Sequence, residues 1–324
     1  MNKRFFSSGS FWNTPIPENP AIDPESDHYI NLLAGEPIPN FWLNIHEFTI
    51  PVYEVGDSTP MRYVHPMTGK FFEPGKSSHG TCFENPLPIP DHAIPDPKHD
   101  RHMALVDYKK RKAWDMFYVK KREDGEWESM TGMTYSLDED GIFDPAEFAV
   151  KDGESIHKYG PGRAAGVPII AGLFMLEEIL AGVIEHKLVF ATACNAYKKY
   201  VWPATWTDGF TEGGLPEGCL IQLDPSLDVD KLGLSPGAKV IARALQKYGA
   251  VNVDVAGGTT IYGEGLYGQP GKSWDGILKP DDLRGLDIRR FRVLKTGTIL
   301  EGGRYHSEEN RRELHDKLWG KKME

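Results

Sequence analysis

The sequence has little cysteine. Three cysteines occur among 324 residues, at Cys82, Cys194 and Cys219, and no two of them have the C-x-x-C spacing. An odd and widely separated set argues against a disulfide framework and against a zinc ribbon. We therefore expect the cysteines to be small, buried apolar residues.

The sequence also lacks a long hydrophobic run. Its longest apolar stretch, residues 167–180, is interrupted by Pro168, by Gly172 and by the acidic pair at 177–178. A membrane-spanning helix needs about 20 consecutive, predominantly apolar residues. No membrane span is predicted.

Long basic segments are missing as well. The formal net charge is -10, and the Lys/Arg clusters at residues 109–112 and 120–122 are short. Duplex nucleic acid is bound largely by neutralising its phosphates, so an acidic chain without a basic stretch is a poor candidate for it. We predict no nucleic-acid partner.

The apolar core of a signal peptide is absent from the start of the sequence. Residues 1–6 read MNKRFF, which is typical of a basic signal-peptide start, but SSGS follows where an apolar stretch of about 7 to 15 residues is expected. Two localisations are left open. The protein is cytoplasmic, or it is secreted and a signal has been removed, in which case Met1 is not the native start.

The common catalytic signatures are missing too. The sequence contains no G-x-S-x-G, no P-loop and no H-E-x-x-H, and it has no internal repeat. No cofactor is predicted, and function has to be argued from groups of residues.

The residues that are present predict a globular chain with an ample core, because 40% are hydrophobic and 26% are charged. Prolines crowd the first hundred residues and favour extended, surface-wrapping segments. We predict a single domain, made of a wrapping segment (1–99), a β core (100–295) and a C-terminal helix (296–324).

Short alternating runs of aromatic and β-branched residues predict mostly strands. The expected strands are at 102–108, 113–120, 125–131, 183–190, 219–223, 250–255, 259–262 and 288–294. Helices are expected at 23–35, 235–249 and 307–319, where capping residues flank an apolar stripe. We predict a mainly β fold, an antiparallel β-sandwich or jelly-roll with a few peripheral helices.

A glycine-rich segment at residues 160–166 delivers Arg163 to the edge of the longest apolar run, where it is a candidate for a fixed charge. Further along, His186 stands on the apolar face of an expected strand, between Ile184 and Leu188. We predict that His186 lines a cleft. The alternative is a histidine that is satisfied within the core.

Asp100 and His102 share one face of an expected strand. Such a pair can point into a groove, where the histidine carries a proton and the aspartate orients it or acts as a base. A salt bridge at a strand edge is the competing interpretation. A metal site made by His102, His186 and a carboxylate is a further alternative.

Aromatic and acidic residues together are typical of sugar sites, which use flat apolar rings against pyranose faces and carboxylates for acid/base work. The candidates are Trp114, Tyr118, Trp202 and Trp206, with Asp115 and Asp208. Trp202 and Asp208 flank a short loop bounded by Pro203 and Gly209, and we predict that they form one wall of a substrate groove. The alternative is that such aromatics fill the core.

Several short motifs run through most of the chain. They are FWNTPI (11–16), D-x-H-M (100–103), GVP (166–168), I-x-H (184–186), VWPAT (201–205), LDPS (223–226) and YG (248–249). Together they resemble a group of bacterial proteins, many of them secreted, that have no settled activity. The resemblance implies a single domain in a polymer-degrading or cell-surface setting. Lys187 departs from the alanine expected there.

These observations predict a glycan-cleaving enzyme that acts on a polysaccharide or oligosaccharide, first of all a glycoside hydrolase with Asp115 and Asp208 as acid/base groups. One alternative is a polysaccharide lyase that uses His, Tyr and Arg side chains. The other is a non-catalytic carbohydrate-binding or cell-surface protein. The predicted catalytic residues are Asp100, His102, Asp115, Arg163, His186 and Asp208, and the predicted substrate-binding residues are Trp114, Tyr118, Trp202 and Trp206.

Overall fold

The computed structural model describes residues 3–38, 41–67, 85–98, 100–144 and 162–319. Within them, strands hold more residues than helices, which confirms the prediction of a mainly β fold. The helices are α1 (Ser26–Ala34), α2 (Leu176–Ala181), α3 (Pro236–Lys247) and α4 (Glu308–Trp319).

The strands fall into two large and three small sheets. They are β1 (Trp42–Asn44), β2 (Ile50–Glu54), β3 (Met61–Arg62), β4 (Val64–Pro66), β5 (Leu87–Pro88), β6 (Met103–Asp107), β7 (Lys112–Phe117), β8 (Lys120–Lys121), β9 (Trp127–Ser129), β10 (Thr131–Ser136), β11 (Leu188–Thr192), β12 (Asn195–Tyr200), β13 (Leu215–Glu217), β14 (Leu220–Leu223), β15 (Ala250–Val255), β16 (Thr260–Tyr262), β17 (Glu264–Gly265), β18 (Phe291–Leu294) and β19 (Leu300–Glu301).

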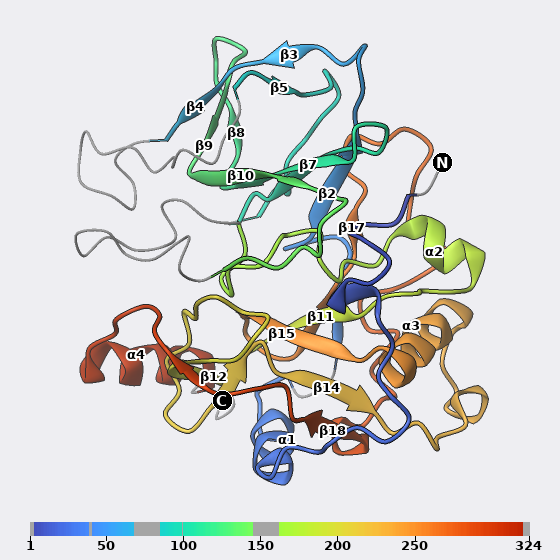
Figure 1. The fold of residues 1–324 in the computed structure, drawn as a ribbon, viewed down its shortest axis with the longest axis vertical. Coiled ribbons are helices and arrows are strands. Elements are labelled where there is room, and N and C mark those ends of the chain that lie inside the picture. Colours follow the sequence, from blue (N-terminus) through green and yellow to red (C-terminus); the bar gives the residue numbers. More distant parts are fainter. Residues whose placement is uncertain (1–2, 39–40, 68–84, 99, 145–161, 320–324) are drawn as a thin grey trace.

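The two large sheets lie one above the other in Figure 1. The upper one has the order β10-β7-β6-β2-β17, and the lower one has the order β1-β16-β11-β15-β14-β18. Both mix parallel and antiparallel pairs, so the expected antiparallel pairing describes them only in part. β11 runs parallel to β15, for example, because β12, β14 and α3 lie between them and return the chain to the same end of the sheet.

The two large sheets share one hydrophobic core. Val52 and Val106 of the upper sheet belong to the same buried cluster as Val189 and Val251 of the lower sheet, and residues 165–173 fill the space between them. Leu188 and Phe190 alternate with Val189 and face a second core, which α1 and α3 cover. The connection through residues 162–175 therefore runs inside the molecule.

The first hundred residues do more than wrap the core. β1 pairs with β16 in the lower sheet, and β2 lies between β6 and β17 in the upper sheet. The predicted division into a wrapping segment (1–99) and a β core (100–295) thus separates strands that lie in the same sheets. These strands were not predicted because proline is disfavoured in central strands. Pro51 nevertheless lies within β2.

The predicted helices are confirmed, with small shifts at their ends. Ser235 caps α3 by accepting a hydrogen bond from the Ala238 backbone, and Pro236 occupies the first turn. α1 begins at Ser26 and ends at Ala34, directly before Gly35, and α4 ends at Trp319 as expected.

The strands expected at 102–108, 113–120 and 125–131 do not all lie in one sheet. β6 and β7 pair as expected, but their next neighbour is β10, whereas residues 127–129 form β9 and pair with β4 and β8. The turn at 123–125 closes the small β8–β9 hairpin, which removes these residues from the large sheet.

The strand predicted from residue 183 begins only at Leu188. Gly182 ends α2 with a φ of 78°, and residues 183–187 are irregular. His186 therefore does not lie on a strand, and that prediction is wrong. The alternation of apolar residues that suggested a strand here occurs in a loop, which packs against the first turn of α2.

Candidate functional site

Four of the predicted residues come together in one buried group. Asp100, His102, Arg163 and Asp208 interact there with two acids that the sequence did not single out, Glu217 and Asp254. The name carboxyl cluster is used below for Asp208, Glu217, Asp254, Arg163 and His102.

A β-bulge positions Asp254. Phe190 of β11 pairs with Asn252 of β15, but the next residue, Ala191, pairs with Asp254. Val253 is thus the extra residue, and a bulge of this kind bends a strand and re-aims its side chains. The Asp254 side chain keeps 17% of its surface exposed, so the cluster is not sealed from solvent.

Two glycines bring Asp208 and Glu217 to the start of β12. A Cβ on Gly209 would lie 2.3 Å from the Ala196 carbonyl oxygen, and one on Gly214 would lie 2.2 Å from that of Cys194. Only glycine permits this approach of two backbones. The loop 207–217 therefore packs directly on β12 and delivers both carboxyl groups.

Arg163 is fully buried and is only partly satisfied. One nitrogen, Nη2, donates to the Ile169 carbonyl oxygen at 2.8 Å, and the guanidinium carbon lies 4.4 Å from the centroid of the Tyr262 ring. Nη1 lies 4.0 Å from Asp254 Oδ2, which is an ion-pair contact without a hydrogen bond. Nη1 and Nε have no hydrogen-bond partner among the described residues.

His102 offers a free ring nitrogen. Its Nε2 lies 3.0 Å from the Gly162 carbonyl oxygen, which can only accept, so Nε2 carries the hydrogen. Burial lowers the pKa of His102 and the Arg163 charge adds to this, although Asp100 opposes it. The neutral ring therefore presents the lone pair of Nδ1, which has no partner among the described residues.

The acids of the cluster hold protons tightly. Burial, and then the negative charges of Asp208 and Asp254, raise the pKa of Glu217 well above its ordinary value. Burial also raises the pKa of Asp208, but the positive charge of Arg304 opposes this rise. For Asp254, burial and the Asp208 charge raise the pKa well above its usual range. All three acids thus release their protons less readily than free carboxyl groups.

Unpaired polar atoms concentrate at this place. Within the described residues, nine buried side-chain nitrogen and oxygen atoms have no hydrogen-bond partner, and six of them are here: His102 Nδ1, Arg163 Nε, Arg163 Nη1, Asp208 Oδ1, Glu217 Oε2 and Asn252 Oδ1. Protein interiors leave few polar groups unpaired, because each one costs free energy. Such a concentration is typical of a site that receives a polar ligand.

Asp115 lies behind the cluster with both oxygens occupied. Oδ1 accepts from the Tyr135 hydroxyl at 2.6 Å and Oδ2 accepts from the Ile169 backbone N–H at 2.7 Å. Burial raises the pKa of Asp115 to about 7. Because Arg163 binds the carbonyl of Ile169, the two side chains hold this residue from both sides. These are the contacts of a structural anchor, and the predicted catalytic role of Asp115 stays a prediction.

The predicted aromatic wall is not formed. Trp202 is 44% exposed, packs on the Phe11 ring at 4.6 Å and lines a cavity of about 540 Å³ that does not include Asp208. Asp208 instead lies beside His306, whose Nε2 is 3.3 Å from the Asp208 carbonyl oxygen. Trp206, which lies between them in the sequence, is buried in the core.

The other two predicted aromatics differ in exposure. Trp114 is buried under the small sheets, as the core alternative expected. Tyr118 is half-buried beside Arg101, whose guanidinium carbon lies 5.5 Å from the centroid of the ring. Of the four aromatics, Trp202 and Tyr118 keep rings that a ligand can reach.

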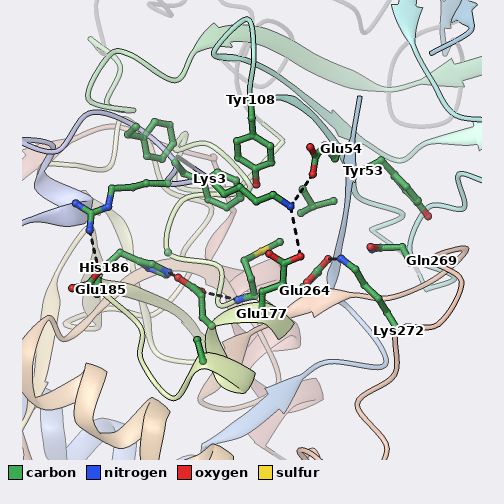
Figure 2. A pocket seen from close by; sticks show the side chains of 18 of the residues that line it. Lys3, Tyr53, Glu54, Tyr108, Glu177, Glu185, His186, Glu264, Gln269 and Lys272 are labelled. Atoms are coloured by element: carbon green, nitrogen blue, oxygen red, sulfur yellow. Dashed lines mark hydrogen bonds and ion pairs between the residues drawn. The ribbon is translucent and has the colours of Figure 1, made fainter. Parts of the chain in front are cut away.

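His186 lines a different cavity, as Figure 2 shows. This cavity, called the His186 pocket below, has a volume of about 750 Å³ and lies between α2, β2, the N-terminal segment 3–6 and residues 264–272. Lys3 reaches across it, with its ammonium group between Glu54 and Glu177. The prediction that His186 lines a cleft is confirmed, but the cleft is not shared with Arg163 or Asp208.

Charges in the His186 pocket are paired. His186 Nε2 lies 3.0 Å from Glu178 Oε1, and although burial lowers the pKa of His186, the Glu178 charge outweighs this and raises it. The other pairs are Lys3 with Glu54 at 3.0 Å, Arg4 with Glu185 at 3.3 Å and Lys272 with Glu264 at 3.3 Å. The pocket is a network of ion pairs in which five glutamates outnumber Lys3, Arg4, Lys272 and His186.

Sequence reasoning missed Glu217, Asp254 and the two asparagines beside them. Asn252 and Asp254 alternate with valines in the expected strand at 250–255, and polar residues on one face of a buried strand were an available signal. Glu217 ends a strand of three residues, and no local pattern marks it.

Metal and membrane roles find no support in the described part of the chain. No three His, Cys, Asp or Glu side chains are arranged there to hold a metal ion, so the alternative site from His102, His186 and a carboxylate is not formed. No described helix combines the length and apolar character needed to cross a bilayer. Cys194 and Cys219 are free and buried as expected, and Cys82 lies outside the described residues.

In a comparison with known proteins, no protein-family model, no curated protein and no solved structure matched the chain.

Proposed function

We propose that this chain is a glycan-cleaving enzyme, a glycoside hydrolase whose acid/base groups are in the carboxyl cluster. The observation that carries the proposal is the meeting of three interacting carboxyl groups with raised pKa values at the place where buried polar atoms lack partners. Ionisable groups with strongly perturbed pKa values gather at functional sites.

Glycoside hydrolysis needs one carboxyl that is protonated and a second that is ionised. Glu217 fits the first role, because burial and two neighbouring acids raise its pKa well above the ordinary value. Asp208 fits the second, because Arg304 lowers its pKa against the effect of burial. Glu217 gives its proton to the glycosidic oxygen as the bond to the sugar carbon breaks. Asp208, whose carboxyl is hydrogen-bonded to Glu217 in the free protein, separates from it when the glycan enters and then takes a proton from the attacking water.

The charge balance favours a neutral glycan over a uronate polymer. Asp100, Asp208, Glu217 and Asp254 outnumber the guanidinium groups of Arg163 and Arg304 that act on them. No excess of positive groups is present among these residues to attract a carboxylate on the substrate. A lyase needs the opposite arrangement, in which positive groups neutralise the uronate. The hydrolase is therefore preferred.

One observation favours a second candidate, carbohydrate binding in the His186 pocket. Tyr108 stacks on Phe5 there, with ring centroids 6.2 Å apart, and the charged groups around the pocket alternate between donors and acceptors. Paired charges with aromatic neighbours fit binding of hydroxyl groups without proton transfer. If Tyr108→Ala abolishes glycan binding while Glu217→Gln leaves it intact, this candidate replaces the first.

The test is turnover on a panel of neutral polysaccharides (cellulose, xylan, mannan, starch) and uronate polymers (alginate, polygalacturonate). We expect cleavage of a neutral member, and at least a 100-fold loss of kcat in Glu217→Gln and in Asp208→Asn. Glu25→Gln, at an exposed carboxyl without a side-chain cap bond, is the control that keeps wild-type turnover. Wild-type turnover by both cluster variants, or unsaturated products from a uronate polymer, would overturn the proposal.

A further inference from the structure

We infer that Asn195 is a positioning residue, which fixes the Glu217 proton on Oε2 and so directs it toward the substrate. The inference rests on the proposed function, because it assigns a role beside the proposed acid. Asn195 begins β12 and is buried, as are Asn252 and Glu217.

The orientation of the Asn195 amide is determined by its neighbours. Its Nδ2 lies 2.7 Å from Glu217 Oε1 and 2.7 Å from the Asp254 carbonyl oxygen. A carbonyl oxygen can only accept, so Nδ2 has to be the atom on that side. On the other side, Asn195 Oδ1 accepts from Asn252 Nδ2 at 2.9 Å.

The orientation of Asn252 is determined in the same way. Its Nδ2 also faces the carbonyl oxygens of Leu215 at 3.4 Å and Pro216 at 3.3 Å. The chain of donors therefore runs in one direction, from Asn252 to Asn195 to Glu217. Reversing either amide would bring oxygen against oxygen.

This direction leaves one place for the Glu217 proton. Oε1 already accepts the Asn195 N–H, whereas Oε2 accepts no hydrogen bond from the described residues and is the oxygen left for the hydrogen bond that Glu217 makes with the Asp208 carboxyl. A protonated carboxyl placed in this way carries its hydrogen on Oε2 and shares it with Asp208 while no substrate is bound. A glycosidic oxygen that enters between the two acids takes the place of Asp208 as the acceptor.

The backbone keeps Asn195 from shifting. Its carbonyl oxygen accepts from the Thr211 N–H at 2.9 Å, and a Cβ on Gly209 would lie 2.7 Å from the Asn195 carbonyl carbon. The loop that carries Asp208 is thus packed on the residue that orients Glu217. Position 195 couples the two proposed acid/base groups through the backbone.

The experiment compares Asn195→Ala and the isosteric Asn195→Asp with the wild type. Loss of the donor removes an interaction that favours the ionised form, so we expect the alkaline limb of the pH–rate profile to move to higher pH. We also expect kcat to fall at least tenfold while KM changes less than threefold. Asn13→Ala is the matched control, because Asn13 is a buried asparagine that donates to two carbonyl oxygens away from the cluster. It should lower the melting temperature without moving the profile.

A carbon-13 NMR titration of Glu217 in the wild type and in Asn195→Ala, which removes the donor without adding a charge, makes the result independent of turnover. A higher titration midpoint in the variant supports the inference, even if the wild type cleaves no glycan and the proposed function fails. Identical midpoints would overturn the inference, as would an unshifted pH–rate profile in an active Asn195 variant. If neither Asn195 variant folds, Asn252→Asp, which removes the donor to Asn195, is expected to shift the midpoint in the same direction, and an unchanged midpoint there would count against the inference.

Discussion

The carboxyl cluster and the His186 pocket are built from the same residue types and satisfy them differently. Each combines a histidine, at least one arginine or lysine and several acids. In the pocket, the charges pair across its walls. In the cluster and the adjoining Asn252, six polar atoms are buried without partners among the described residues. The difference separates a network of paired charges from one in which polar groups are left unpaired.

The two regions also differ in what they contribute to stability. The exposed ion pairs of the pocket, such as Lys3 with Glu54, contribute about 0 to 1 kcal/mol each, so they change the stability of the fold little. A buried polar atom without a partner costs about 1 to 3 kcal/mol. The cluster is therefore a net cost to folding, and such costs are typical of sites that are kept for function.

The largest contrast is expected when one arginine is removed from each region. Arg163→Met leaves Asp254 and its neighbours without their buried cation, and we expect the free energy of unfolding to fall by about 3 to 5 kcal/mol. Arg4→Met breaks the partly exposed pair with Glu185, and a loss of about 0 to 1 kcal/mol is expected. Urea denaturation measures both. Equal losses in the two variants would remove the distinction between the regions.

A smaller effect concerns the pH dependence of stability through Asp115. The unfolded carboxyl has a pKa of about 4, whereas burial raises the folded pKa of Asp115 to about 7. The folded state holds this proton more tightly, so stability is lost as the pH rises from about 4 through about 7. Relative to Asp115→Asn, which does not titrate, the wild type should lose about 2 to 4 kcal/mol across this window. A difference that is constant with pH would show that Asp115 is ionised throughout.

The two histidines should titrate in opposite directions. The pKa of His102 is lowered, chiefly by burial, so its contribution to stability is present above pH 6.5 and is lost as the pH falls through the folded pKa. The pKa of His186 is raised, because Glu178 outweighs burial, so its contribution is present below pH 6.5 and is lost as the pH rises. Nitrogen-15 NMR of the two rings gives both midpoints, and shifts of the same sign would contradict the contrast.

Local signals in the sequence were enough for much of the fold. Ser235 and Pro236 mark the start of α3 and Gly35 marks the end of α1, because caps and breakers act on the residues next to them. The pairing of β1 with β16 could not be predicted in this way, since it joins residues more than two hundred positions apart. The turn residues at 123–125 indicate the β8–β9 hairpin, but they do not indicate the sheet to which its strands belong.

The candidate site was predicted in part for the same reason. Asp100, His102, Arg163 and Asp208 stand out as polar residues in apolar or glycine-rich surroundings. Glu217 does not, because its role depends on a loop that packs on β12 through Gly209 and Gly214. His186 was assigned to a strand because its neighbours alternate, whereas Gly182 ends α2 and leaves His186 beside Glu178.

The location of a bound glycan tests the central claim most directly. Glu217→Gln removes the proposed acid and keeps the shape of the side chain, so a neutral oligosaccharide from the panel can be held without being cleaved. In a crystal structure of this variant soaked with cello-, xylo- and manno-oligosaccharides, we expect a glycosidic oxygen within hydrogen-bond distance of the side chain at position 217, with Asp208 on the other side of the bond. A sugar bound in the His186 pocket, with the carboxyl cluster occupied only by water, would contradict the account.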